Sequence, residues 1–191
     1  MTVALWLMAL QGMIGAFDTV YYHEWKAKLP ARGRAAAPEL ALHACRDFLY
    51  AVLFGSLPWL AWRGVYAAVL CLVIAAEIVL TMWDFIVEVR VRRPIGDVYG
   101  GERVTHAAMG ILYGSMLACL IPVVRVWWHM PTALIASPAP VVPALRWALT
   151  IMAAGVLISG LRDLYAALGL PGGAWPWRIA EPAARGADMQ N

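Results

Sequence analysis

Two segments of the chain carry a glutamate followed four residues later by a histidine. The first pair is Glu39 with His43, and the second is Glu102 with His106. Residues four apart on a helix project from nearly the same face, so each pair can direct a carboxylate and an imidazole at one metal ion. The two pairs therefore predict two related halves of a metal site.

Each pair is preceded by a further glutamate and a basic loop that contains proline. With one loop residue deleted, a single alignment superposes Glu24 on Glu88, Pro30 on Pro94, Glu39 on Glu102, His43 on His106, and Leu49-Tyr50 on Leu112-Tyr113. The match predicts a duplicated helical hairpin whose two copies cross a membrane in the same direction, with a pseudo-twofold axis along the membrane normal. Glu24 and Glu88 would then bridge two ions about 3.5 to 4 Å apart.

This arrangement resembles the ferritin-like di-iron carboxylate proteins, in which two helices each give a Glu and two others each give a Glu-x-x-His motif. The resemblance covers the first four predicted helices and rests on Glu24, Glu39, His43, Glu88, Glu102 and His106, with one more residue between Glu and His here. It implies a four-helix bundle, two metal ions and oxygen-dependent oxidation. Iron is the favoured metal, with manganese or zinc as alternatives.

Four more residues could add a ligand or orient one, namely Asp18, His23, Asp47 and Asp84. Asp18 is an alternative ligand from the first helix. His23 points about 100° away from Glu24 on a regular helix, so it becomes a ligand only if the helix ends there. Asp84 could bind metal or orient a histidine, or it could form a buried pair with Arg46.

Composition predicts that the solvent of this chain is lipid. Hydrophobic residues make up 62% of the 191 residues and charged residues only 14%, whereas a soluble domain is about 25% charged. Five segments are long enough to span a bilayer, which takes about 20 helical residues: 2–22, 39–62, 65–89, 104–128 and 142–168. The predicted fold is an all-α polytopic membrane protein of about five transmembrane helices.

The first four helices form the duplicated bundle, with repeat one over 3–62, repeat two over 65–128, and an extra helix over 142–168. Residues 171–191 are predicted to form an interfacial segment and a polar tail, so the helical bundle occupies 1–170. Pro58 lies late in the second segment and could kink it.

Basic residues gather on one side of the predicted bundle. That side has Lys26, Lys28, Arg32, Arg34, Arg90, Arg92, Arg93, Arg103, Arg162, Arg178 and Arg185, and the opposite side has Arg63, Arg125 and Arg146. The positive-inside rule then places the N-terminus outside, and the C-terminus and all the Glu/His clusters at the cytoplasmic end, with a bacterial inner membrane as the expected location. Because the basic residues lie in loops beside apolar runs, nucleic acid is not an expected partner.

The resulting hypothesis is a membrane-embedded dinuclear metal protein, favoured as a di-iron oxidoreductase. It would act on a lipid-soluble or membrane-delivered substrate and draw electrons from a donor. A b-type haem carrier is one alternative, although His43 and His106 each sit four residues from a glutamate. A metal-binding or transport protein without redox chemistry is another, and so are interfacial salt bridges in which Glu24 and Glu88 pair with Lys26 or Arg92.

Overall fold

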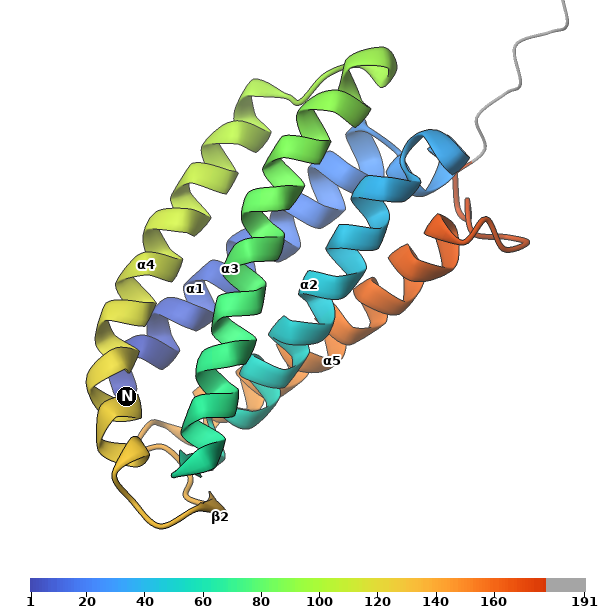
Figure 1. The fold of residues 1–191 in the computed structure, drawn as a ribbon. Helices are drawn as coiled ribbons and strands as arrows, with labels where there is room; N and C mark the ends of the chain where they lie inside the picture. Colours follow the sequence, from blue (N-terminus) through green and yellow to red (C-terminus); the bar gives the residue numbers. More distant parts are fainter. Residues whose placement is uncertain (178–191) are drawn as a thin grey trace, which may run out of the picture.

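The computed structural model describes residues 1–177 and consists mainly of long helices that run side by side (Figure 1). The α-helices are α1 (Thr2–Asp18), α2 (Ala37–Ser56), α3 (Val65–Arg92), α4 (Gly100–Trp128) and α5 (Pro143–Ala167). α1 continues directly into a π-helical segment, Thr19–Lys26, and short 3-10 turns cover Leu29–Ala35 and Arg93–Ile95. Most of the predicted polar tail, including Arg178 and Arg185, lies outside the described residues.

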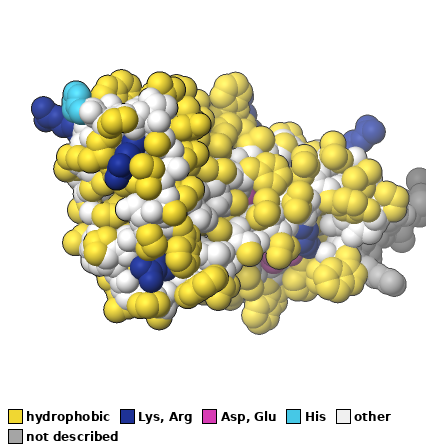
Figure 2. Space-filling view, turned by 90° about the horizontal axis from the view of Figure 1, so that it is seen from below, with side chains coloured by type: hydrophobic (Ala, Val, Ile, Leu, Met, Phe, Trp, Pro, Cys, Tyr) yellow, Lys and Arg dark blue, Asp and Glu magenta, His cyan; other side chains and the backbone are white. Residues whose placement is uncertain are grey.

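Four helical stretches are long and apolar enough to cross a membrane, which confirms the all-α, membrane-type prediction. They are Thr2–Lys26, Val65–Ile95, Gly100–Trp128 and Pro143–Ala167. Large hydrophobic side chains such as Leu72, Ile111 and Ile151 are exposed along them, and the face in Figure 2 is covered mainly by hydrophobic side chains. α2 does not meet the same criterion, because its 20 residues include Glu39, Arg46 and Asp47.

The predicted second segment, 39–62, is too long at its C-terminal end. α2 stops at Ser56, and Pro58, which has no backbone N–H to continue a helix, follows the end of the helix instead of kinking it. Leu60–Arg63 then form strand β1, which pairs antiparallel with β2 (Ala133–Ala136). The strand pairing holds the C-terminal ends of α2 and α4 together at one end of the bundle.

Helix packing divides the bundle into two closely packed pairs. α2 lies along α5 and α1 lies along α4, while α3 packs mainly against α2. The buried side chains Leu5, Leu53, Leu70, Met116 and Leu149 come from all five helices and form one hydrophobic core. At the α2–α5 contact, a Cβ added to Gly160 would lie 2.9 Å from the Cβ of Asp47.

This contact makes Gly160 a sensitive position, whereas Gly155 on the same helix has nothing within 4 Å of an added Cβ. Gly160→Ala should destabilise the fold by about 1 to 3 kcal/mol, because overpacking forces the two helices apart. The matched Gly155→Ala should leave stability unchanged or raise it by about 1 kcal/mol. Thermal unfolding in detergent, followed by circular dichroism, measures both; equal midpoints would show that α2 and α5 are not this close.

Candidate metal centre

Three of the four histidines meet inside one end of the bundle, next to the loops that follow α1 and α3. His23 comes from the π-helical segment, His43 from α2 and His106 from α4. The rings of His23 and His43 are stacked with centroids 4.6 Å apart, and the ring of His106 lies edge-on to His23 at 6.2 Å. Helices far apart in sequence therefore bring three imidazoles to one place.

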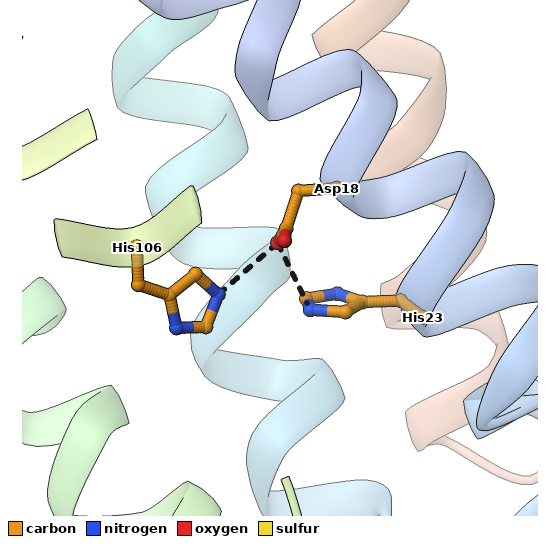
Figure 3. Close-up of side chains that lie close together, drawn as sticks. All are labelled: Asp18, His23 and His106. Carbon is orange, nitrogen blue, oxygen red and sulfur yellow. Dashed lines mark hydrogen bonds and ion pairs between the residues drawn. The ribbon is translucent and has the colours of Figure 1, made fainter. Parts of the chain in front are cut away.

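Asp18 joins two of these histidines (Figure 3). Its Oδ2 lies 3.1 Å from Nε2 of His106 and 3.3 Å from Nε2 of His23, and its Oδ1 accepts a hydrogen bond from the Thr105 hydroxyl. Asp18 is 3% exposed. One ligand atom from each of Asp18, His23 and His106 lies within 4.8 Å of the other two, which is close enough for the three to hold one metal ion.

The π-helix explains why His23 reaches this group. A π-helix bonds each residue to the one five positions away, so residues five apart lie nearer to one face than they do on an α-helix, where about 140° separates them. Asp18 and His23 have that separation, and the segment from Thr19 to Lys26 is π-helical. The expectation of a regular helix, with His23 turned aside unless the helix ended, is therefore wrong. π-helical turns occur frequently at functional sites.

A second group with metal-binding geometry contains Glu88, Glu102 and His106. Oε2 of Glu88 lies 3.7 Å from Nδ1 of His106, and Oε1 of Glu102 lies 3.1 Å from Nε2 of His23. The two groups share His106 but approach it from opposite ring nitrogens. The two groups thus meet at this imidazole.

His43 has carboxylates on both sides of its ring. Nε2 lies 3.3 Å from Asp84, and Nδ1 lies 3.7 Å from Asp163. Arg46 donates to the same oxygen of Asp84 at 2.5 Å, so Asp84 contacts both the histidine and the arginine that were considered as its partners. Asp163 is 7% exposed and lies slightly closer to His43, at 3.7 Å, than to Arg162, at 3.9 Å.

Arg92 lies in the core of the bundle and not in a loop. It was assigned to the loop after the third helix, but α3 extends to it and its side chain is 1% exposed. Its Nε donates to both oxygens of Glu39, at 2.8 and 3.0 Å, and its Nη2 donates to Oε1 of Glu102 at 2.9 Å. Both carboxylates of the Glu-x-x-x-His pairs therefore contact one buried guanidinium.

Glu24 is not part of either group. Its carboxylate accepts hydrogen bonds from Arg162 and from the indole of Trp177, at 2.8 Å in the second case. Asp47 lies one turn beyond His43 on α2 and lines the same cavity as the histidines. The structure thus brings together Glu39, His43, Glu88, Glu102, His106, Asp18, His23 and Asp84, and leaves Glu24 with α5.

Several buried polar atoms in this cluster have no hydrogen-bond partner. They are Nε2 of His23, Oδ1 of Asp84 and Oε1 of Glu88. Buried polar atoms are nearly always paired, and an orphan is commonly explained by a bound ion or water. Nitrogen and carboxylate oxygen ligands of this kind suit iron, manganese and zinc. The donor set therefore fits a metal ion.

A cavity of about 540 Å³ begins at this cluster and continues into the bundle. Asp18, His23, His43 and His106 line one end, and its other walls are mainly apolar, with Phe54, Ile78, Met82, Met109 and Leu117 among them. A cavity of this size can enclose a small organic molecule. The polar centre is therefore accessible from a largely apolar chamber.

No family model, no curated protein and no solved structure matches this chain.

Breaking the Arg92 contacts should strongly destabilise the protein. Arg92→Met keeps much of the side-chain volume but leaves Glu39 and Glu102 buried without their cation, which costs about 3 to 5 kcal/mol. The control is Arg103→Met, whose partner Asp97 lies 3.3 Å away and is largely exposed, so the cost should be about 0 to 1 kcal/mol. Equal unfolding midpoints for the two variants in detergent would contradict the structural role of Arg92.

Proposed function

We propose that this chain is an integral-membrane protein with a dinuclear metal centre, favoured as di-iron, that oxidises a lipid-soluble or membrane-delivered substrate. The convergence of Asp18, His23 and His106 carries the proposal. Three buried or half-buried ligand residues from two helices approach one point, and Nε2 of His23 lies near two carboxylates without a hydrogen bond to either. Such an arrangement suits a cation better than it suits the side chains alone.

The charge balance supports a bound cation. Seven carboxylates are buried, namely Asp18, Glu39, Glu77, Asp84, Glu88, Glu102 and Asp163, whereas among residues 1–177 Arg92 is the one buried lysine or arginine. Burying uncompensated charge is costly, and more so within a membrane. Protons on the histidines or carboxylates can offset part of the excess negative charge. One or two divalent ions would offset it directly and would also bind the unpartnered atoms.

The proposed ligands differ from the expected set on the first two helices. Asp18 and His23 replace Glu24 on the first helix, and Glu88, Glu102 and His106 complete the two groups. Arg92 holds Glu39 and thereby positions it beside His43, whose Nε2 is 4.0 Å from Oε1 of Glu39. His43, Asp84 and Asp163 surround the centre on the side of α2 and α5.

Cross-helix pairs support the proposed duplication. His106 of α4 contacts Asp18 of α1, and His43 of α2 contacts Asp84 of α3. The proposed pseudo-twofold axis would place one of these pairs at the position of the other. The same axis would relate Glu39 to Glu102, and Arg92 contacts both of them. Asp18 and Glu24 are six residues apart and Asp84 and Glu88 only four, and the longer separation is in the π-helical segment.

Two iron ions held here would supply oxygen-dependent redox chemistry. The protein residues hold the ions, and the apolar chamber limits water and admits a hydrophobic molecule to the centre. An electron donor would act as the second partner. The cytoplasmic position of the centre follows from the basic loops, in the orientation with the N-terminus outside.

The metal content of variants tests the centre. We expect about two ions per chain in protein purified from cells grown with iron, and a loss of about half or more in Asp18→Asn and His106→Ala, because each removes a ligand from the shared groups. The matched Glu24→Gln should retain its metal, since Glu24 contacts Arg162 instead.

Two outcomes would contradict this proposal. One is a folded preparation that stays metal-free after reconstitution with iron, manganese and zinc. The other is a His106→Ala variant with unchanged metal. His43→Ala combined with His106→Ala should lose little more metal than the stronger single variant, because residues that form one centre act as a unit. Arg32→Ala, in the loop, serves as the neutral control.

Topology reporters test the orientation and the proposal that α2 is a fifth span. Fusions after Arg32 and Gly96 should report the cytoplasm, and fusions after Gly64 and Pro131 should report the outside. The strand pairing between Leu60–Arg63 and Ala133–Ala136 requires the last two to agree. A cytoplasmic signal at Gly64 would remove α2 from the spanning helices.

A further inference from the structure

A second polar layer lies deeper in the bundle than the metal centre. Its members are Gln11 on α1, Tyr50 on α2, Glu77 on α3 and Tyr113 on α4, and each lies seven residues from a residue of the centre: Asp18, His43, Asp84 and His106 respectively. Seven residues are close to two helical turns, so each pair shares one helix face about 10.5 Å apart. All four side chains line the cavity that begins at the centre.

Hydrogen bonds link Gln11, Tyr50 and Glu77, but several polar atoms of this layer have no partner. The Tyr50 hydroxyl donates to Oε1 of Glu77 at 2.6 Å, the Thr81 hydroxyl donates to the same oxygen at 2.7 Å, and Nε2 of Gln11 donates to the Tyr50 oxygen at 3.1 Å. Oε1 of Gln11, Oε2 of Glu77 and the Tyr113 hydroxyl are buried without a hydrogen bond. Glu77 itself is 1% exposed.

The chemistry of the free atoms indicates what would satisfy them. Oε1 of Gln11 is an amide oxygen, which only accepts hydrogen bonds, and Oε2 of Glu77 accepts them when the carboxylate is ionised; the Tyr113 hydroxyl can donate or accept. A ligand that only accepts would leave both oxygens unpaired, at a cost of about 1 to 3 kcal/mol each. A hydroxyl-bearing ligand can donate to one oxygen and accept from Tyr113.

The cavity also reaches the lipid-facing surface between α3 and α4. Ile78 and Met82 of α3 and Gly110 and Gly114 of α4 line the cavity and are exposed. A Cβ at either glycine would meet no atom within 4 Å, so these positions border open space. A molecule dissolved in the membrane can therefore enter sideways.

We propose that the inner layer binds the hydroxyl end of a lipid-soluble alcohol or phenol that enters between α3 and α4. Its hydrocarbon body then lies along the apolar walls toward the metal centre. That this ligand is the substrate rests on the proposed function, whereas its binding depends only on the cavity and the inner layer.

Paired ligands test the inference in neutral phosphatidylcholine nanodiscs, with titration heats corrected for partition into empty nanodiscs. 4-Nonylphenol should bind saturably with one site per chain. 4-Nonylanisole, which has the same body but no hydroxyl proton, should bind about tenfold more weakly because it leaves the acceptors unpaired. Equal affinities for the two compounds, or no saturable binding of the phenol, would overturn the proposal.

Variants locate the binding. Tyr113→Phe and Glu77→Gln should each weaken binding of 4-nonylphenol about tenfold, and the matched controls Tyr66→Phe and Asp97→Asn, which do not line the cavity, should not. Gly110→Leu should weaken or slow binding by filling the opening, compared with Ala118→Leu on the same helix. Unchanged affinity in Tyr113→Phe, which keeps the aromatic core, would remove the inner layer from the binding site.

Metal analysis of the same samples separates the two proposals. Chains that stay metal-free after reconstitution but bind the phenol would reject the metal centre and keep the inner-layer site. Metal-loaded chains that treat phenol and anisole alike would keep the centre and reject this site.

Discussion

Compensation of buried negative charge is the constraint on which the histidine-containing end of this bundle depends. Carboxylates from α1, α2, α3, α4 and α5 are buried there, and a medium of low dielectric makes each one costly unless a cation or a proton accompanies it. Arg92 meets this need for Glu39 and Glu102, and in doing so it ties α2, α3 and α4 together. Removing that guanidinium affects three helices at once.

The remaining carboxylates face the histidines. Asp18 and Glu88 contact His106, and Asp84 and Asp163 contact His43, while His23 lies between the two sets. This arrangement has more acceptors than donors, and several of its atoms have no partner. Unpaired acceptors destabilise an ordinary protein core, but they can act as ligands for metal ions. We therefore favour a metal centre over a network of salt bridges.

The apolar chamber connects this centre to a lipid environment. Its walls come from the same helix faces that carry the two polar layers, because positions seven apart on a helix share a face. Residues on the cavity side of α3 and α4 are small or flexible where the chamber meets the surface, as Gly110 and Met82 show. The bundle thus combines a buried charged cluster with a cavity whose walls are mainly apolar.

The sequence by itself determined the membrane-type helices and pointed to most of the residues that cluster at one end, because apolar run length and the four-residue spacing of Glu and His are local properties. The placements of Arg92, His23 and Glu24 were decided only by the tertiary structure. Whether Arg92 ends in a loop or in the core depends on Glu39 and Glu102, which are 53 and 10 residues away. His23 turns inward because the backbone is π-helical. Glu24 turns away from the histidines because it pairs with Arg162, which is 138 residues further along the chain. Long-range partners of this kind leave no periodic signal, since they depend on how the helices pack and not on the order of residues within one helix.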